Sequence, residues 1–291
     1  MKIRENVSLT PLTTFKIGGI ARRVIELESF EDARQLAAEF LEEDFFCLGG
    51  GSNVLFPDEV FQIPVLRLVD ELSDYSFSQN RVRVGGGAFL PSLAHEAAAH
   101  GLSGLEWAGG IPGSVGGAVK MNAGAHGFNM LQLVDEIKIL DSDRKISKIS
   151  SDELESGYRK SGLADDVIIL EVELELEEDS RREINRRQLR NLRARRLSQP
   201  VEVPSAGSIF KNPPGESAGE LIERAQLKGE TMGNAKISRK HANFIVNEGR
   251  ATACDVRKLI DLVRRRIRKE FNLELELEIC IPVSIPAGDP R

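Results

Sequence analysis

The chain has 291 residues, of which 41% are hydrophobic and 29% charged, and its formal net charge at pH 7 is −6. This length corresponds to about two domains, each large enough to bury a core of its own. The acidic balance excludes a protein whose whole surface binds nucleic acid. No apolar run approaches the ~20 residues that cross a bilayer, and the first residues, Met1 to Asn6, lack the apolar segment of a secretory signal.

The cysteines, Cys47, Cys254 and Cys280, are too few and too widely spaced for a disulfide framework or a zinc site. We therefore expect no metal. We expect all three to be buried as small hydrophobic residues in a protein of the reducing cytoplasm.

The first part of the chain alternates short strands with helices. Ser29, followed by Asp32, predicts the start of a helix, and a second helix is predicted over residues 91–100. Apolar or alternating stretches predict strands over 23–27, 45–48, 65–68, 81–85, 136–140 and 167–176. These strands are too many and too closely spaced for a doubly wound sheet, which favours an α+β fold.

A glycine-rich ribbon runs from Gly109 to Gly127, and seven of its nineteen residues are glycine. Apolar residues between the glycines, such as Ile111 and Val119, distinguish it from a flexible linker. Glycine at this density indicates either backbone pressed against a flat or charged ligand or a series of tight turns. The ribbon alone does not decide between the two.

A second glycine-rich stretch, residues 49–53 with the sequence Gly-Gly-Gly-Ser-Asn, directly follows the strand predicted over 45–48. It matches neither a Walker loop nor the Rossmann turn. The stretch offers several backbone and side-chain donors to a phosphate. A glycine-rich hairpin is the alternative, but no strong hairpin dipeptide is present, which favours the phosphate site.

Eight arginines crowd the helix predicted over residues 180–196. Nucleic-acid binding is one interpretation, but the acidic stretch over 171–179 favours a solvated helix that faces this strand. Beyond the helix, the pattern predicts helices over 218–225 and 254–271 and an alternating final strand over 273–279.

Seven separate motifs give a more specific indication. They are Thr-Thr-Phe-Lys-Ile-Gly-Gly at 13–19, Gly-Gly-Gly-Ser-Asn at 49–53, Ile-Pro-Gly-Ser-Val-Gly-Gly-Ala at 111–118, Met-Asn-Ala-Gly-Ala at 121–125, Gly-Tyr-Arg at 157–159, Ser-Ala-Gly-Ser-Ile-Phe-Lys-Asn-Pro at 205–213 and Lys-His-Ala-Asn-Phe-Ile at 240–245. In this order they resemble the UDP-N-acetylenolpyruvoylglucosamine reductases, in their shorter subtype, over nearly the whole chain.

The resemblance implies an α+β flavoprotein with the FAD-binding fold of the vanillyl-alcohol oxidases and a C-terminal α+β domain that binds substrate. The implied domains are a first FAD-binding subdomain over 1–55, a second over 56–179, a basic helical connector over 180–200 and the substrate-binding domain over 201–291. The implied protein is a cytoplasmic monomer that binds neither nucleic acid nor a membrane.

The implied reaction is the NADPH-dependent reduction of UDP-N-acetylglucosamine enolpyruvate to UDP-N-acetylmuramate through non-covalent FAD, a step of peptidoglycan precursor synthesis. Its catalytic residues would be Arg159, Ser208 and Glu278. Substrate would contact Tyr158, Arg196, Lys211, Asn212 and His241. The cofactor would contact Gly49, Gly50, Gly51, Ser52, Asn53, Gly109, Ile111, Pro112, Gly113, Ser114, Gly116, Gly117, Asn122 and Gly124.

Two points stay open at this level. Glu274, Glu276 and Glu278 alternate along the predicted last strand and would share one face, so Glu278 is chosen from the family pattern alone. Asn272 also stands where the family commonly has glycine. The competing functions are a flavin-dependent oxidase of the same fold acting on another substrate, and a non-catalytic nucleotide- or nucleic-acid-binding module.

Overall fold

The computed structural model describes residues 1–40 and 43–283, which form two compact units built from several chain segments each. The first unit contains Met1–Arg4, Arg23–Gly50 and Pro64–Ala194, and the second contains Glu5–Arg22, Gly51–Ile63 and Arg195–Arg291. The functional domains predicted from the resemblance remain predictions. The end of the last one, residues 284–291, lies outside the described residues.

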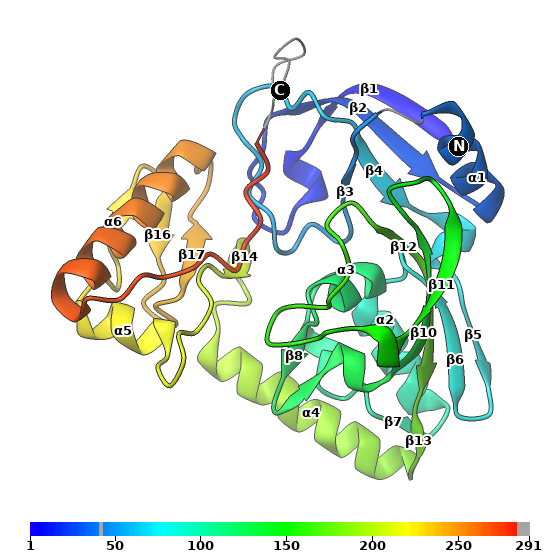
Figure 1. Ribbon diagram of the computed structural model, residues 1–291. Coiled ribbons are helices and arrows are strands. Elements are labelled where there is room, and N and C mark those ends of the chain that lie inside the picture. Colours follow the sequence, from blue (N-terminus) through cyan, green and yellow to red (C-terminus); the bar gives the residue numbers. More distant parts are fainter. Residues whose placement is uncertain (41–42, 284–291) are drawn as a thin grey trace. The chain divides into compact units, whose positions relative to one another are not determined.

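A four-stranded sheet occupies the N-terminal part of the chain (Figure 1), in the order β1 (Lys2–Ser8), β2 (Ile20–Leu27), β4 (Val65–Leu68) and β3 (Phe46–Cys47). Strands β2 and β3 both run parallel to β4. Helix α1 (Phe30–Glu39) begins after Ser29, whose hydroxyl accepts a hydrogen bond from the backbone N–H of Asp32, as the capping pattern predicts. Buried Leu36 joins α1 to the sheet core around Ile25 and Leu66.

A five-stranded antiparallel sheet forms the larger part of the first unit. Its order is β11 (Ile146–Ser150), β10 (Val134–Leu140), β12 (Ile168–Glu175), β6 (Arg81–Gly85) and β5 (Tyr75–Ser78). Helices α2 (Leu90–Ala99) and α3 (Val115–Lys120) share a buried apolar cluster with this sheet, and α3 contacts β12 and β6. Two short pairs complete the unit: β7 (Leu102–Ser103) with β13 (Glu177–Glu178), and β8 (Gly124–Ala125) with β9 (Phe128–Asn129).

The arginine-rich segment is a helix, α4 (Arg181–Ser198), and the prediction that it faces the acidic stretch is confirmed for one pair, Arg187 with Asp179 at 2.6 Å. The register of the five-stranded sheet places basic residues of β6 and β10 beside the glutamates of β12, in the pairs Lys138–Glu171, Arg83–Glu173 and Arg81–Glu175. Basic residues on the neighbouring strands therefore balance the charges of the β12 glutamates, which distance along the sequence does not predict.

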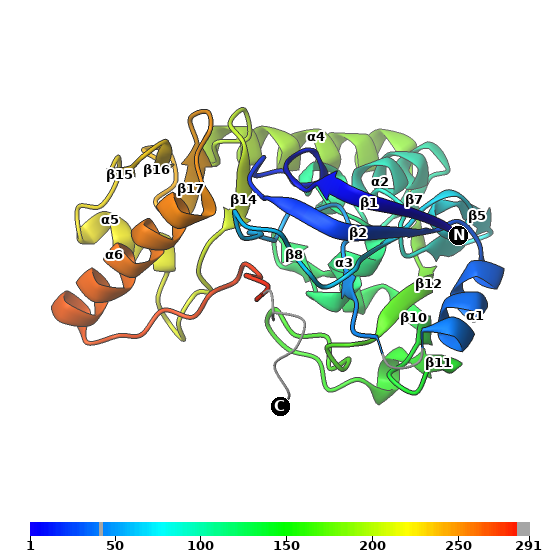
Figure 2. The ribbon, with the colours of Figure 1, turned by 90° about the horizontal axis from the view of Figure 1, so that it is seen from above.

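The second unit has a four-stranded antiparallel sheet in the order β14 (Ser205–Ser208), β17 (Phe244–Asn247), β16 (Ala235–Ile237) and β15 (Thr231–Met232). Helices α5 (Ala218–Arg224) and α6 (Ala253–Phe271) pack beside this sheet (Figures 1 and 2). The predicted apolar face of α6 is confirmed, because all five of its predicted members are buried: Val256, Leu259, Ile260, Val263 and Ile267. Phe15, Ile17 and Leu55 from the N-terminal segments enter the same core.

Both ends of α6 have distinct caps. Thr252 and Asp255 form a reciprocal capping box, and the carboxylate of Asp58 accepts hydrogen bonds from the backbone N–H groups of Ala253 and Cys254. At the other end, Asn272 adopts a left-handed conformation with φ 53°. Asparagine is the residue that tolerates this conformation best after glycine, so the departure from the family glycine preserves the cap.

Two sequence predictions are wrong in this part of the fold. Residues 273–279 form no strand and make one isolated bridge, between Phe210 and Leu277. Their alternation reflects burial against the second core, not a continuous ladder. The cysteines are not buried, because Cys47, Cys254 and Cys280 all have accessible side chains.

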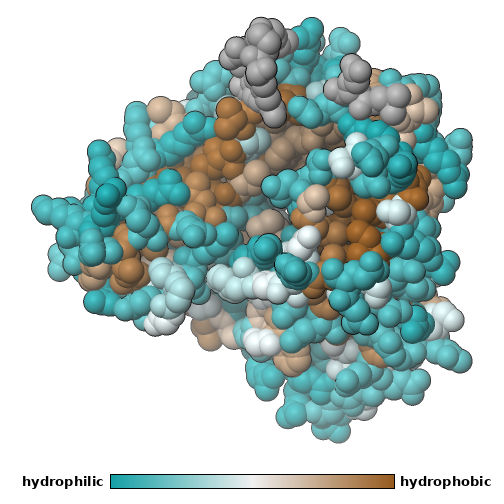
Figure 3. Space-filling model, viewed as in Figure 1, coloured by the Kyte–Doolittle hydropathy of each residue, from teal (hydrophilic) through white to brown (hydrophobic). Residues whose placement is uncertain are grey.

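Short 3₁₀ turns occupy Thr10–Leu12, Asp70–Ser73, Ala108–Gly110, Met130–Gln132 and Ser151–Glu153. Hydrophilic residues dominate the molecular face in Figure 3, as expected for a chain in which 29% of residues are charged. Among the described residues, no helix combines the length and apolar character needed to cross a membrane.

Candidate functional site

In the first unit, the glycine-rich ribbon and the start of the Gly-Gly-Gly-Ser-Asn stretch lie directly against each other. A Cβ atom placed on Gly49 would be 2.2 Å from Oγ of Ser114, and one placed on Gly50 would be 2.6 Å from Cα of Gly113. Both distances are too short for any side chain. Glycine is required here because two backbone segments, more than sixty positions apart in sequence, approach each other closely.

Other ribbon glycines also face protein atoms. A Cβ on Gly109 would lie 2.7 Å from Nε2 of Gln188, and one on Gly124 would lie 2.4 Å from the carbonyl oxygen of Phe128. A Cβ on Gly116 would approach the carbonyl oxygen of Gly86 at 3.0 Å. The predicted contacts of these glycines with the cofactor stay a prediction. At these positions the glycines permit close packing of the scaffold.

This packing leaves a row of unused backbone donors. Within the described residues, the N–H groups of Gly49, Gly50, Gly113 and Ser114 donate to no protein acceptor, and neither do those of residues 51–53 in the second unit. Consecutive free N–H groups beside glycine form a concavity that favours anions. The residues present therefore fit the pyrophosphate of a flavin dinucleotide.

Some of the predicted cofactor residues instead use their polar groups within the protein. The hydroxyl of Ser114 accepts the N–H of Gly117 at 3.2 Å and caps α3. The N–H of Gly116 donates to the carbonyl of Gly86, and that of Ile111 to the carbonyl of Ala108. These groups shape the ribbon.

Asn122 links the ribbon to the predicted catalytic arginine. Its buried side chain donates a hydrogen bond from Nδ2 to the carbonyl oxygen of Gly157 at 3.0 Å and accepts the N–H of Leu131 at 3.2 Å. Gly157 and Lys160 exchange two backbone hydrogen bonds around a two-residue turn. Asn122 therefore fastens the turn at its first residue.

The turn holds Tyr158 and Arg159 between its two ends. Arg159 has φ 56°, a left-handed conformation that costs roughly 1–2 kcal/mol for a residue with a side chain. Its guanidinium lies 5.1 Å from the centre of the Tyr158 ring and 3.5 Å from the carbonyl oxygen of Gly124. Arginine at a position that suits glycine is a strained feature of the kind concentrated at functional sites.

In the second unit, backbone hydrogen bonds bring Ser208 and Glu278 close in space. Ser208 ends β14, and the carbonyl of the next residue, Ile209, accepts the N–H of Glu278 at 2.8 Å. The carbonyl of Glu278 in turn accepts Nδ2 of Asn53 at 2.9 Å. Glu278 is thus bonded to the end of the Gly-Gly-Gly-Ser-Asn stretch, and it is linked to the predicted serine through the neighbouring residue Ile209.

This arrangement distinguishes the three candidate glutamates. Glu276 is 78% exposed and pairs with Nζ of Lys211 at 3.3 Å, and Glu274 is 67% exposed and pairs with Arg268 at 3.2 Å. Only the backbone of Glu278 bonds to the residue after Ser208. The choice of Glu278 as the catalytic carboxylate stays a prediction from the family pattern.

The predicted nucleotide-binding residues of the second unit differ in how they are used. Oδ1 of Asn212 accepts the N–H of Ala218 at 3.0 Å, at the start of α5. Arg196 is exposed, whereas the preceding Arg195 has a buried Nε with no partner among the described residues, and burial lowers its pKa. The sequence motif did not distinguish these neighbouring arginines.

His241 is held as a neutral donor. Burial, together with the charge of Lys228, lowers its pKa from the usual 6.5. Nδ1 accepts the N–H of Asn243 at 3.3 Å, and the ring packs edge-on against Phe244 at 4.8 Å. In the neutral ring the proton then resides on Nε2, so His241 can offer a hydrogen bond but not a positive charge to an anion near neutral pH.

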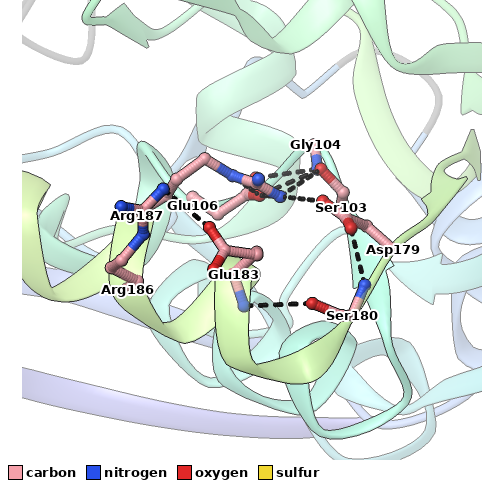
Figure 4. A network of polar contacts seen from close by, with 8 residues as sticks. All are labelled: Ser103, Gly104, Glu106, Asp179, Ser180, Glu183, Arg186 and Arg187. Carbon is pink, nitrogen blue, oxygen red and sulfur yellow. Dashed lines mark hydrogen bonds and ion pairs between the residues drawn. The ribbon is translucent and has the colours of Figure 1, made fainter.

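Sequence reasoning missed a polar network around the residues that precede the glycine-rich ribbon of residues 109–127 (Figure 4). Arg187 on α4 donates to the carboxylate of Glu106 at 2.9 Å, and contacts Ser103 at 3.2 Å and Asp179 at 2.6 Å. Burial raises the pKa of Glu106, but hydrogen bonds from the N–H of Gly104, from Arg187 and from Ser103 outweigh it and hold the pKa below its usual value. The network fixes the residues immediately before Trp107 and the ribbon.

Comparison with known proteins agrees with this arrangement. The FAD binding domain family matches residues 21–150, and the C-terminal domain family of UDP-N-acetylenolpyruvoylglucosamine reductase matches residues 199–282. UDP-N-acetylenolpyruvoylglucosamine reductase 2 of Symbiobacterium thermophilum is 42% identical over 275 residues, which span 94% of this chain and 89% of the relative. The chain belongs to the UDP-N-acetylenolpyruvoylglucosamine reductase family.

Two further relatives support membership of the reductase family. The Bacillus subtilis UDP-N-acetylenolpyruvoylglucosamine reductase is 40% identical and covers 94% of this chain and 91% of its own length. The crystal structure of the reductase from Thermus caldophilus matches with a TM-score of 0.86 and 42% identity, over 97% of this chain and 99% of that chain. These findings confirm the predicted α+β flavoprotein fold and an FAD-containing oxidoreductase.

Proposed function

We propose that this protein reduces UDP-N-acetylglucosamine enolpyruvate to UDP-N-acetylmuramate, with NADPH as the reductant and FAD as the cofactor, in the synthesis of peptidoglycan precursors. The observation that carries the proposal is a chain of hydrogen bonds in the second unit: the carbonyl of Ile209, next to Ser208, accepts the N–H of Glu278, and the carbonyl of Glu278 accepts Nδ2 of Asn53 in the phosphate-binding stretch. This chain of hydrogen bonds supports a site in which a hydroxyl group and a carboxyl group act beside a segment with free anion donors.

The cofactor would be held by the unused backbone N–H groups of residues 49–53 and of Gly113 and Ser114. When bound, FAD would supply the hydride chemistry between NADPH and C3 of the enolpyruvyl group. Asn122 and the ribbon glycines would keep the backbone in position for the cofactor.

Hydride addition at C3 leaves negative charge that spreads from C2 to the carboxylate of the substrate. Arg159 would stabilise this charge, because a guanidinium is permanently charged and binds a carboxylate through two parallel hydrogen bonds. Ser208 would donate its hydroxyl proton to C2, and Glu278, in protonated form, would donate a hydrogen bond to the same carboxylate. The segments that carry Ser208 and Glu278 are hydrogen-bonded to each other in the second unit.

The nucleotide would be bound by Lys211, Asn212, Arg196 and His241, with Tyr158 at the entrance. His241 suits a phosphate oxygen as a neutral Nε2–H donor, whereas Lys211 supplies positive charge. Asn212 would contribute its amide NH₂ group, because a phosphate oxygen needs a donor, while its carbonyl oxygen accepts the N–H of Ala218. We further propose that the enzyme acts as a monomer in the cytoplasm.

The test is a visible spectrum of the purified protein under anaerobic conditions. A flavin spectrum should bleach on addition of NADPH and return on addition of the enolpyruvyl substrate, with UDP-N-acetylmuramate as the product. Reduced enzyme without the enolpyruvyl substrate is the control. Reoxidation by air as fast as by this substrate would indicate an oxidase and overturn the proposal, as would a colourless protein that does not bind FAD.

A further inference from the structure

Thr14 connects two segments of the second unit that carry the proposed chemistry. Its backbone N–H donates to the carbonyl of Gly51 at 3.0 Å. Its hydroxyl donates to the carbonyl of Ser205 at 2.7 Å, and the carbonyl of Gly51 lies farther from that hydroxyl, at 3.5 Å. One residue therefore bonds to the phosphate-binding stretch through its backbone and to the start of β14 through its side chain.

The connection closes a ring of hydrogen bonds around Ser208. From Ser205, β14 leads to Ser208 and Ile209, whose carbonyl accepts the N–H of Glu278. The carbonyl of Glu278 accepts Nδ2 of Asn53, two residues after Gly51. Thr14 completes the ring, because its backbone bonds to Gly51 and its side chain bonds to Ser205.

The loop that carries Thr14 is itself rigidly supported. Phe15 is fully buried in the second core, and its carbonyl accepts Nδ2 of Asn247 at 3.1 Å. The hydroxyl of Thr13 donates to the carbonyl of Ile17 at 3.2 Å. A bond from this loop therefore fixes its partner relative to the core, so the 2.7 Å bond of Thr14 constrains where β14 begins.

We propose that Thr14 is a positioning residue, whose hydroxyl sets the place of Ser208 relative to the phosphate-binding stretch. The proposal rests on the proposed function for its kinetic consequence, but its structural consequence is independent of it. Loss of the hydroxyl leaves the Ser205 carbonyl without this donor, so the start of β14 keeps its pairing with β17 but loses its bond to the loop that carries Thr14. Misplacement of a reacting group by about 1 Å costs about 100-fold in rate.

The variants are chosen to remove or retain one hydrogen bond. Thr14→Val keeps the size of the side chain and the backbone bond to Gly51 but lacks the hydroxyl, and Thr14→Ser retains the hydroxyl. Thr10→Val is the matched control, because the hydroxyl of Thr10 also donates to a backbone carbonyl at 2.9 Å, but to the nearby Gly18. If Thr14→Val yields no folded protein, Thr14→Ala takes its place.

The first measurement is amide hydrogen exchange of the protein with and without FAD. Thr14→Val should increase exchange in peptides covering residues 205–209 and 277–280, and Thr14→Ser should restore protection. Thr10→Val should leave both peptides unchanged. Unchanged protection in Thr14→Val, or an equal effect of Thr10→Val, would overturn the proposal whether or not the protein has the proposed activity.

The second measurement separates the two half-reactions. Thr14→Val should bind FAD and be reduced by NADPH at the wild-type rate, whereas its reoxidation by the enolpyruvyl substrate should slow by about 10- to 100-fold. Thr14→Ser should recover most of this loss. Equal slowing of both half-reactions, or no rescue by serine, would show a general structural role and contradict the proposal. Wild-type enzyme that fails to turn over this substrate would refute the proposed function alone.

Discussion

Nδ2 of Asn122 lies 3.0 Å from the carbonyl oxygen of Gly157, at the first residue of the turn that carries Arg159. The opposite side of the same amide accepts the N–H of Leu131. A single buried asparagine thus ties the end of the glycine-rich ribbon to a strained turn thirty-five positions further along the chain. The two functions of its amide can be separated by substitution.

Asn122→Asp should weaken this tie selectively. Aspartate retains an acceptor for Leu131 and tolerates the positive φ of 40°, but as a carboxylate it cannot donate to Gly157. We expect reoxidation of reduced flavin by the enolpyruvyl substrate to slow by about tenfold, corresponding to about 1.4 kcal/mol, with FAD still bound. Asn122→Gly, which lacks both hydrogen bonds, should have the larger effect. Wild-type kinetics in Asn122→Asp would contradict the assigned role of the donor.

Arg187→Met should destabilise the first unit. It leaves the carboxylate of Glu106, which is only 9% exposed, without its cationic partner, and loss of a hydrogen bond to a charged group costs about 1.5–3 kcal/mol. The free energy of urea unfolding measures this loss. Arg186→Met is the matched control in the neighbouring position of α4, because Arg186 is 75% exposed and pairs only with Glu183 in Figure 4. Equal stability of the two variants would count against the network.

The buried histidine should give the second unit a characteristic pH dependence. The folded-state pKa of His241 is lowered from 6.5, so the unfolded chain binds more protons than the folded one below that pH. Its contribution to stability is therefore complete above pH 6.5 and is lost as the pH falls through the folded-state pKa, with a slope of at most about 1.4 kcal/mol per pH unit.

His241→Gln should remove this slope from the unfolding free energy, measured by hydrogen exchange of peptides from α6 and β17. His100→Gln replaces an exposed histidine of the first unit and should leave the slope in place. A slope that persists in His241→Gln would have to come from other groups.

Ser208→Ala should separate proton donation from flavin binding. The variant should bind FAD and be reduced by NADPH, but reoxidation by the enolpyruvyl substrate should fall by about 10²- to 10⁴-fold, the contribution of a positioned general acid. Ser205→Ala, in the same strand, should retain the wild-type rate, because the group of Ser205 that the ring uses is its backbone carbonyl. Near-wild-type reoxidation in Ser208→Ala would exclude the proton-donor role.

The elements with strong periodicity were predictable from sequence, and the reasons for the failures are physical. The apolar spacing of α6 and the capping residues of α1 depend on local sequence, and both predictions are confirmed. The last predicted strand failed because its alternating burial arises without a continuous partner strand, leaving one isolated bridge. The accessible cysteines likewise depend on tertiary neighbours that composition does not reveal.

Predictions for the site show the same division. Motifs identified Arg159, Ser208 and Glu278 as candidates, but no sequence feature indicated that Thr14 and Asn53 support the segments around Ser208 and Glu278. Their partners are more than 190 positions away. Glu106 and Arg187 are 81 positions apart. Arg187 lies in a helix with many arginines, and the sequence does not indicate which of them forms the pair. Such contacts follow from the fold and not from local pattern.

The core of the second unit contains Phe15, Ile17 and Leu55 together with residues beyond 200. During synthesis the N-terminal contributors leave the ribosome long before α6 and its neighbouring strands exist. Their apolar side chains must therefore wait unburied, or in temporary contacts, until the end of translation. A fragment that begins at residue 201 would lack these three side chains and have a gap in its interior, so the substrate-binding region is not expected to be autonomous.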